Sequence, residues 1–220
     1  MRNLVIFGLT DAAQLAHFYF SRESKYRIVA SCADSKYMVA TEFCGTPVVP
    51  FEDLAASFPP DRNDLFIAVG YSKLNQVRKE KYLAAKAMGY RLATYVSPAA
   101  TVLNDGAIGD NCFILEDNTI QPFATIGNNV TLWSGNHIGH HSVIGDHCFL
   151  ASHIVVSGRV KIGERCFVGV NATFRDNISI GDACIIGAGS LILADADSGG
   201  VYVAEGTVRS PVPSSRVRRI

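Results

Sequence analysis

The sequence lacks a surplus of charge of either sign. Its 220 residues carry 20 lysines and arginines against 20 aspartates and glutamates, so the formal net charge is zero, and the isoelectric point is near 7.0. Binding to nucleic acid or to an anionic membrane surface depends on clustered positive charge. The balanced composition therefore argues against both kinds of partner.

Long apolar runs are also missing. No stretch approaches the roughly 20 consecutive apolar residues that a helix needs to span a bilayer. The N-terminus passes from Met1-Arg2-Asn3 into a short apolar strand, without a secretory leader and its small-residue cleavage site. We therefore expect no membrane insertion and a cytoplasmic location.

Cysteine pairs of the CxxC type are absent, although the chain has six cysteines. Four of these follow a repeating isoleucine by four residues and share an eighteen-residue column with Val130. In such a column cysteine acts as a small apolar residue, and without CxxC pairs a zinc site is not expected. We predict a buried core column and no bound metal. The four are Cys112, Cys148, Cys166 and Cys184.

What the sequence does contain is a period of six. From Val96 to Ile192 every sixth residue is apolar, and all of these except Phe174 are aliphatic. This period fits neither the 3.6-residue turn of an α-helix nor a simple alternating strand. It is typical of a hexapeptide-repeat parallel β-helix, in which one side chain per flat segment points to the axis. The sequence therefore predicts a β-helix over this region.

A second period, of eighteen residues, lies within the first. At every third hexad a glycine follows the repeating isoleucine and is itself followed by Asp, Asn or Glu. Three hexads therefore make one coil with three faces. We predict that these glycines supply the positive φ of a turn at one corner. No insertion breaks the phase, so long loops should not project from the helix. The glycines are Gly109, Gly127, Gly145, Gly163 and Gly181.

The first 95 residues alternate between apolar strands and helical segments. Strands are expected at 4–8, 27–31, 65–70 and 90–96, and helices at about 11–20 and 74–88. The alternation predicts a small parallel α/β (Rossmann-like) sheet that binds ligands at the carboxyl ends of its strands. We divide the chain into an α/β domain (1–95), a β-helix (96–193) and a C-terminal tail (194–220).

The first strand-to-helix turn, G-L-T-D at 8–11, lacks the GxGxxG fingerprint that lets a backbone approach a pyrophosphate closely. A helix N-terminus still holds phosphate well, and a carboxylate after the second strand suits a ribose or a base. The alternative is a sheet that packs without any nucleotide. The candidate substrate-binding residues are Gly8, Thr10, Asp11, Asp34 and Gly70.

Three segments of the β-helix carry a family resemblance: IGHHSVIG at 138–145, SGRVKIG at 157–163 and CFVGVN at 166–171. With weaker likeness at 66–70 and 201–203, essentially the whole chain resembles the bacterial nucleotide-sugar N-acetyltransferases of the hexapeptide class. That family acetylates amino sugars of the bacillosamine, perosamine and viosamine type. Its coils are left-handed, so the resemblance implies a left-handed parallel β-helix here.

The resemblance also implies which residues act. The family's general base is a histidine in an I-x-H-x-x-x-I-G stretch, which corresponds to His140. A glycine one coil further offers its backbone N–H to the thioester oxygen, which corresponds to Gly158. The coenzyme would be bound by Gly158 together with Val170 and Ala188, which match positions that line it in the family.

The activity implied is acetyl-CoA-dependent N-acetylation of a nucleotide-linked amino sugar, of the 4-amino-4,6-dideoxy type, for cell-surface polysaccharide. The α/β domain would bind the nucleotide sugar. Acetyl-CoA, the cosubstrate, would lie between neighbouring subunits of a homotrimer. Two other functions stay open, an O-acyltransferase acting on a sugar and a non-catalytic nucleotide-sugar-binding scaffold. The α/β domain argues against the first, and His140 with an intact Gly158 argues against the second.

Two positions depart from the family pattern. Relatives often carry an acidic residue directly after the catalytic histidine, where this chain has His141. Their C-terminal G-x-P-A-K over the adenine is replaced by AEGTVR at 204–209. Asn136, His137 and His141 are candidates to orient His140. For the two histidines, a role as plain polar corner residues is an equally good interpretation.

Five histidines fall within residues 137–153, a density that could indicate a metal site. His141, His147 and His153 occupy the same place in three successive hexads, hence three different faces of the prism. They cannot converge on one ion within a subunit. No metal is therefore expected at this cluster.

Overall fold

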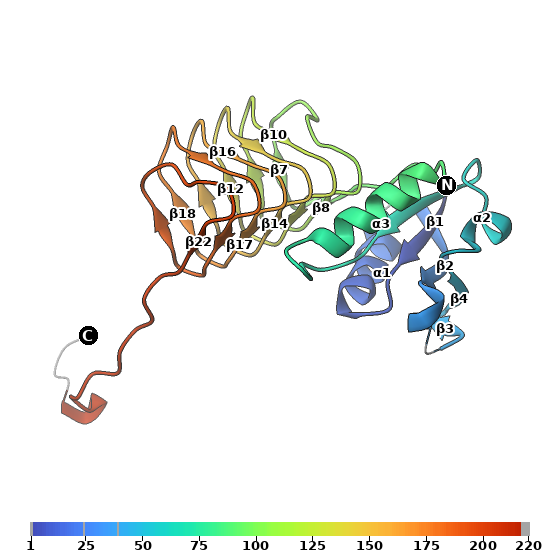
Figure 1. Cartoon of the computed structure of the whole chain (residues 1–220), viewed down its shortest axis with the longest axis horizontal. Helices are drawn as coiled ribbons and strands as arrows, with labels where there is room; N and C mark the ends of the chain where they lie inside the picture. The colour runs from blue at the N-terminus through green and yellow to red at the C-terminus, as the bar shows by residue number, and fades with distance from the viewer. Residues whose placement is uncertain (1, 24, 39, 217–220) are drawn as a thin grey trace.

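The computed structural model describes residues 2–23, 25–38 and 40–216 of the chain. An α/β part at one end joins a β-helix, from which residues 204–216 extend away from the body (Figure 1). None of the helices in these ranges is long and apolar enough to span a bilayer. The predicted fold class, a small α/β part followed by a left-handed parallel β-helix, is confirmed.

The α/β part contains β1 (Arg2–Phe7), α1 (Asp11–Glu23), β2 (Tyr26–Ala33), the 3₁₀ turn η1 (Ser35–Tyr37), β3 (Glu42–Phe43), β4 (Thr46–Pro50), α2 (Leu54–Ser57), β5 (Asn63–Ile67) and α3 (Gln76–Ala87). They form one sheet with the strand order β3-β4-β2-β1-β5. Strands β1, β2, β4 and β5 are parallel. Strand β1, which lies between β2 and β5, is buried from Leu4 to Phe7, as a parallel strand covered on both faces should be.

This part differs from the sequence prediction in two places. The antiparallel hairpin of β3 and β4 and the helix α2 lie where the pattern indicates no element, because they are too short to show a period. A sheet strand over 90–96 is not formed. Leu92 makes a single bridge to Leu65, and Tyr95–Val96 already belongs to the β-helix.

The β-helix winds two-residue strands through three flat parallel sheets. The seven-strand sheet contains β6 (Tyr95–Val96), β8 (Phe113–Ile114), β11 (Thr131–Leu132), β14 (Phe149–Leu150), β17 (Phe167–Val168), β20 (Ile185–Ile186) and β22 (Val201–Tyr202). The six-strand sheet contains β7 (Thr101–Val102), β9 (Thr119–Ile120), β12 (His137–Ile138), β15 (Val155–Val156), β18 (Thr173–Phe174) and β21 (Leu191–Ile192). The four-strand sheet contains β10 (Thr125–Ile126), β13 (Val143–Ile144), β16 (Lys161–Ile162) and β19 (Ser179–Ile180), and the 3₁₀ turn η2 (Ser214–Arg216) lies in the tail.

Each coil turns three corners. The first corner leads from the seven-strand to the six-strand sheet, the second to the four-strand sheet, and the third back to the seven-strand sheet. From Asp105 to Gly189 every sixth residue has a positive φ, including Phe123 and Ala183. Most of these residues are Gly, Asn, Asp or His, which tolerate the left-handed conformation, but Arg159 and Arg165 adopt it as well, so the coil geometry imposes it.

The glycines of the eighteen-residue column have another role than the predicted one. All five lie at the third corner with a negative φ, so the prediction that they supply positive φ is wrong. A Cβ on Gly109 would lie 2.6 Å from the carbonyl oxygen of Gly127. The adjacent N–H of Asp110 donates to Oδ1 of Asn128 at 3.1 Å. Glycine is required because successive coils approach closely at this corner.

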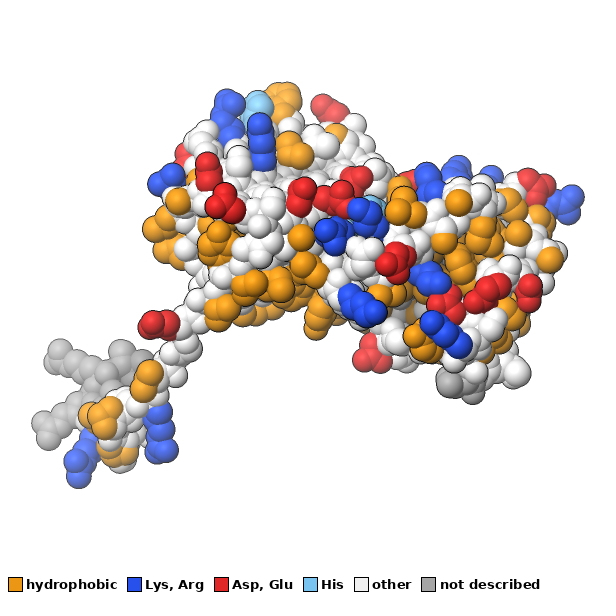
Figure 2. All heavy atoms as spheres, viewed as in Figure 1, with side chains coloured by type: hydrophobic (Ala, Val, Ile, Leu, Met, Phe, Trp, Pro, Cys, Tyr) orange, Lys and Arg blue, Asp and Glu red, His pale blue; other side chains and the backbone are white. Residues whose placement is uncertain are grey.

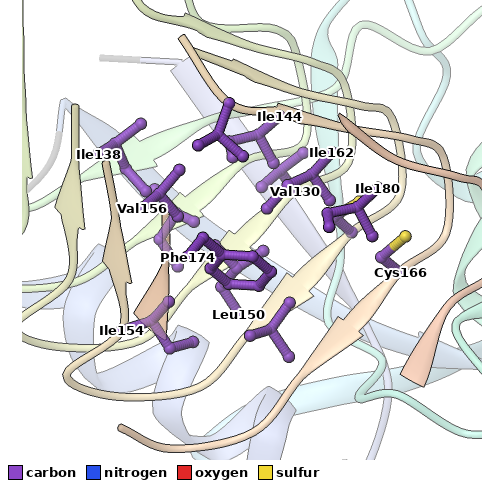
Figure 3. Packing of buried hydrophobic residues seen from close by; sticks show 14 of the residues in the cluster. Val130, Ile138, Ile144, Leu150, Ile154, Val156, Ile162, Cys166, Phe174 and Ile180 are labelled. Atoms are coloured by element: carbon purple, nitrogen blue, oxygen red, sulfur yellow. The ribbon is translucent and has the colours of Figure 1, made fainter. Parts of the chain in front are cut away.

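The repeating apolar side chains fill the interior of the β-helix (Figure 3). From Ile114 to Ile186 each of them is at most 3% exposed, and Phe174 is packed among the aliphatic ones. The predicted cysteine column is confirmed, since its four thiols are free and buried. Their sulfurs lie near carbonyl oxygens of the next coil, as Cys148 Sγ does at 3.0 Å from the oxygen of Gly163.

Helix α3 lies along the third corner and fastens the α/β part to the β-helix (Figure 1). The buried guanidinium of Arg78 donates to the carbonyl oxygens of His147 at 2.9 Å and of Cys148 and Gly70 at 3.0 Å. Burial lowers the pKa of Arg78 to about 10, which still leaves it charged at neutral pH. The positive charge of Arg78 is thus stabilised by backbone carbonyl oxygens rather than by a carboxylate.

More exposed charges surround this contact. Lys79 forms an ion pair with Glu164, and Lys86 forms one with Asp110. Figure 2 shows acidic and basic side chains interspersed where the two parts meet. Exposed pairs of this kind contribute little to stability, so the buried contact is the stronger one.

The free edge of the sheet is closed by the β-helix. Oδ1 of Asn111 accepts the N–H of Ile67 in β5 at 2.8 Å, and Nδ2 donates to Asn129 at 2.7 Å. Asn129 in turn contacts Nδ1 of His147 at 2.8 Å. Burial lowers the pKa of His147, so its ring is a neutral member of this polar ladder. This histidine of the cluster therefore serves the junction of the two parts.

Candidate functional site

His140 lies at the second corner, just after β12, with an exposed side chain. Its backbone N–H donates to Oε1 of Gln121 at 2.9 Å. Its Nδ1 lies 3.1 Å from Nδ1 of His141, so one ring donates and the other accepts. Within the described part of the chain, Nε2 of His140 has no hydrogen-bond partner. That nitrogen belongs to an exposed side chain and lies beside Gly158 of the next coil, where it can exchange a proton with a bound molecule.

His141, a candidate to orient His140, does contact it. The two rings meet edge to face with their centroids 5.3 Å apart. The ring of His141 also lies 4.7 Å from that of Phe123, one coil earlier at the same corner. The contact to Phe123 fixes the ring of His141, which then fixes that of His140.

Gly158 lies beside His140, one coil further along the second corner. A Cβ at this position would fall 2.6 Å from Cε1 and 2.7 Å from Nε2 of His140. Any larger residue would displace the ring. The structure therefore brings together the two residues that were predicted to act on the thioester.

The backbone N–H of Gly158 is also available. At the third corner the equivalent N–H is capped by a side chain of the next coil, as that of Glu164 is by Oδ1 of Asp182 at 2.7 Å. The residue in the capping position above Gly158 is Asp176, whose carboxylate instead accepts from Nδ2 of Asn177 at 2.6 Å. Among the described residues the N–H of Gly158 has no acceptor, so a donor and a free imidazole nitrogen lie side by side.

Asn136 and His137, the other orienting candidates, do not contact the His140 ring. Asn136 is buried, and its Oδ1 accepts the N–H of Ile154 at 2.8 Å. His137 is half-buried in β12, opposite Thr119 of the preceding coil. Asn136 thus joins two successive coils at the first corner. His137 belongs to the outer face of the six-strand sheet.

Val170 and Ala188 lie at the first corner, one coil apart, and both are exposed. They are adjacent, because a Cβ on Gly169 would lie 2.5 Å from the backbone nitrogen of Ala188. The first and second corners are separated by the six-strand sheet. Within one chain these two residues and His140 therefore occupy different edges of the prism.

Four of the five substrate candidates line one cleft at the carboxyl ends of the strands. Gly8, Thr10, Asp34 and Gly70 border this cleft of about 420 Å³, together with Lys81 of α3. The fifth candidate, Asp11, lines a neighbouring hollow of about 270 Å³ between α1 and the seven-strand sheet. The turn and the two strand ends thus converge as the α/β pattern predicts.

Two of these residues have partners that the sequence does not reveal. Asp34 forms an ion pair with Lys81, whose ammonium also lies 5.1 Å from the ring centre of Phe51. Gly8 has φ +124°, and a Cβ there would lie 2.6 Å from the carbonyl oxygen of Ala68. The close approach of β1 to the end of β5 accounts for this glycine without any ligand.

Lys81 is the residue that sequence reasoning missed in this cleft. Lys81 lies on the side of α3 that faces the end of the sheet. The sequence does not reveal this, because it depends on how the helix packs against the sheet. With Asp34, Lys81 places one positive and one negative charge at the cleft. Among the residues that the structure describes, no group of three or more His, Cys, Asp or Glu side chains is arranged to hold a metal.

The sequence model of the bacterial transferase hexapeptide (six repeats) family matches residues 105–140, 123–158 and 159–194. No curated protein matches the sequence. Among solved structures, the acetyltransferase domain of PglB from Neisseria gonorrhoeae superposes with a TM-score of 0.82 at 21% identity, over 93% of this chain and 97% of that chain.

Two further structures cover the whole chain to a similar extent. PerB from Caulobacter crescentus, solved with CoA and GDP-perosamine, has a TM-score of 0.81 at 22% identity, over 93% of this chain and 95% of that one. WeeI from Acinetobacter baumannii has a TM-score of 0.76 at 20% identity, over 93% and 97%. Residues 105–194 are thus bacterial transferase hexapeptide repeats, and 93% of the chain has the fold of these structures.

Proposed function

We propose that the protein transfers the acetyl group of acetyl-CoA to the amine of a nucleotide-linked amino sugar. The observation that carries this is the second corner, where Nε2 of His140 and the N–H of Gly158 lie together and neither has a hydrogen-bond partner among the described residues. The proposal is supported by two structures of the same fold, PglB with acetyl coenzyme A and PerB with CoA and GDP-perosamine. On this likeness the sugar is of the 4-amino-4,6-dideoxy type.

The reaction joins the amine nitrogen to the thioester carbon and releases the CoA thiol. As the N–C bond forms, the nitrogen must lose a proton, and His140 is placed to accept it through Nε2. The carbonyl oxygen gains negative charge in the same step, and the N–H of Gly158 stabilises that charge. When the C–S bond breaks, His140 returns the proton to the leaving thiolate. Each proton is therefore accounted for without a metal ion.

The α/β part (1–95) is proposed to hold the nucleotide. The N-terminus of α1 presents free backbone N–H groups at Thr10 and Asp11, which suit a pyrophosphate. Asp34, at the end of β2, is placed to accept hydrogen bonds from a ribose hydroxyl or a base, with Lys81 beside it. The nucleotide sugar would then lie along the carboxyl ends of the strands, with its base near β2 and its sugar near β5, as ligands do in other doubly wound sheets.

The coenzyme is proposed to lie between copies of the chain in a homotrimer. In one chain Val170 and Ala188 lie at the first corner and His140 at the second, with the six-strand sheet between them. One coenzyme would therefore contact the Val170–Ala188 pair of one copy and the His140 of another. The exposed valines and leucines of the last coils, Leu191, Leu193, Val201 and Val203, offer apolar area near the tail for such contacts.

A ligand panel tests the proposal. Ligands that bind only the folded protein raise its melting temperature. We expect shifts with CoA or acetyl-CoA and with one of UDP, dTDP and GDP, and thiol release when acetyl-CoA meets an amino sugar on that nucleotide. Absence of any shift with both CoA and acetyl-CoA, and of thiol release with every amino sugar, would overturn it.

A further inference from the structure

Helix α1 and the strands beside it enclose a cavity that the proposed acetyl transfer does not use. It has a volume of about 590 Å³ and is lined by side chains of α1 between residues 14 and 21, by residues 26–28 at the start of β2, and by Cys44 and Thr46 of the β3–β4 hairpin. None of these residues borders the nucleotide cleft or the hollow beside it. The cavity therefore needs an explanation of its own.

The buried polar group of this cavity is His17, which is 6% exposed. Its ring meets that of Phe43 edge to face, with the centroids 5.7 Å apart. Its Nε2 lies 2.8 Å from the hydroxyl oxygen of Ser31. Nδ1 makes no hydrogen bond with any residue that the structure describes, and it is not among the polar atoms sealed in the core. This nitrogen is therefore open to the cavity.

A chain of hydrogen bonds determines which ring nitrogen of His17 carries the proton. The hydroxyl of Thr46 donates to the carbonyl oxygen of Phe43 at 2.9 Å, so it accepts from Ser31, which lies 3.0 Å away. Because Ser31 has only one proton to donate, it accepts from Nε2 of His17. Burial lowers the pKa of His17 to about 4, so the ring is neutral at neutral pH. Nδ1 therefore presents a lone pair to the cavity.

The remaining walls are apolar or positively charged. Phe18, Tyr26 and Ile28 supply aromatic and aliphatic surface, and none of the lining residues is acidic. Arg27 is exposed; its guanidinium donates to Oδ1 of Asn3 at 3.0 Å and forms no ion pair with a described carboxylate. A molecule in the cavity would therefore meet a buried acceptor, aromatic side chains and one cation.

The acceptor is in place before any ligand arrives. Cys44 and Gly45, the two turn residues of the hairpin, have φ values of +49° and +76°, as in the tight turns that hairpins favour. Thr46, which follows the turn, is bonded to both Phe43 and Ser31. The hairpin thus holds Ser31, which in turn fixes the ring of His17. A preorganised site of this kind lowers the entropic cost of binding.

We propose that this cavity is a second ligand site, for a small anion that carries an aromatic or heterocyclic ring and an N–H or O–H donor. The donor bonds to Nδ1 of His17, the ring lies against Phe18 and Tyr26, and the anionic group meets Arg27. Nucleoside monophosphates and phenolic carboxylates share this chemistry. The volume is within the range of roughly 300–1,000 Å³ that is typical of small-molecule sites. The inference does not rest on the proposed acetyl transfer.

Calorimetric titration of the full chain tests the site. The probes are AMP, CMP, GMP, UMP and 4-hydroxybenzoate, and we expect at least one to bind with a Kd below about 1 mM. The controls are the parent nucleoside and inorganic phosphate for a nucleotide, and phenol and benzoate for the phenolic acid. Each control lacks at least one of the three groups and should bind at least about tenfold more weakly. The probe that binds identifies the source of the ligand; no binding by any of the five, or equal binding by a control, would overturn the proposal.

His17→Gln removes the acceptor without removing the donor to Ser31. The amide nitrogen of glutamine can take the place of Nε2, whereas no atom takes the place of Nδ1. The variant should fold and bind the probe at least about tenfold more weakly.

Ser21→Trp fills the cavity from the exposed surface of α1, and Ser21→Ala at the same position is its matched control. The tryptophan variant should lose at least about tenfold in affinity, and the alanine variant should stay within about twofold of the wild type. This pair carries the test if His17→Gln does not fold. Unchanged affinity in folded Ser21→Trp would refute the site.

Lys81→Met separates this site from the nucleotide cleft, which Lys81 borders. Affinity for the probe should stay within about twofold of the wild type in this variant. A probe that is lost in Lys81→Met and retained in Ser21→Trp occupies the nucleotide cleft, and that result would overturn the proposal.

Nitrogen NMR of the histidine rings gives a readout besides affinity. His17 should carry its proton on Nε2 in the free protein, and the bound probe should shift its Nδ1 resonance. A proton on Nδ1 in the free protein, or an unshifted Nδ1 resonance at saturating probe, would contradict the assignment of this nitrogen as the acceptor.

Discussion

Replacing Arg78 with methionine should destabilise the protein far more than removing any exposed charge at the same junction. Arg78 is 2% exposed, and its guanidinium donates to the carbonyl oxygens of Gly70 and His147 at 3.0 and 2.9 Å. Methionine keeps most of the volume but leaves these buried oxygens without a donor. Each buried carbonyl oxygen that loses its donor costs about 1–3 kcal/mol, so the loss of two or more should cost about 3–5 kcal/mol in total.

The assay is thermal unfolding followed by circular dichroism and by tryptophan emission. For a chain of this length, about 3–5 kcal/mol corresponds to a fall of roughly 6–20 °C in the midpoint. Lys79→Met, next to it on the same helix, removes the exposed ion pair with Glu164 and should cost at most about 1 kcal/mol. If Arg78→Met melted within the range of Lys79→Met, the buried contact would not be what joins the two parts.

Three further predictions follow from other regions. Burial lowers the pKa of His17 in helix α1 from 6.5 to about 4. Between these pH values the unfolded chain binds a proton that the folded chain does not, so the free energy of unfolding should fall by about 3 kcal/mol as the pH drops from 6.5 to 4. The urea midpoint of His17→Gln should fall less over the same range. An equal fall in both proteins would contradict this. Phe174→Ala empties the centre of the β-helix and should cost about 3–5 kcal/mol in urea unfolding, where a cost below 1 kcal/mol would mean that the coil closes around the gap. Sedimentation at micromolar concentration should show a trimer, and a stable monomer would exclude a site shared between copies.

Much of this fold follows from the sequence because the β-helix is built from local repeats. One core residue per hexad fixes the period, and three hexads per coil place His140 and Gly158, eighteen residues apart, on adjacent coils. The spacing of glycines at the third corner was visible as well, but its cause was not. Close approach between coils, rather than positive φ, selects Gly109 and its equivalents.

The remainder depends on contacts that no local pattern carries. Arg78 lies on an ordinary helix, and its acceptor His147 is 69 residues away. Phe113 and Phe149 occupy repeating positions of the β-helix that the sequence shows. They line a hollow only because α1 and β5 are docked above them, and that docking is set by the junction around Arg78 and Asn111.

The most direct measurement of the central claim is the turnover of His140→Ala at neutral pH with saturating acetyl-CoA. A positioned general base contributes roughly 10²–10⁴-fold, so kcat should fall by about that factor while the melting temperature stays at the wild-type value, because this exposed side chain is outside the core. His141→Asn, which keeps a residue suited to positive φ, should lose less than about tenfold. If His140→Ala kept most of the wild-type turnover, the amine would enter without needing a base and His140 would not be the catalytic residue.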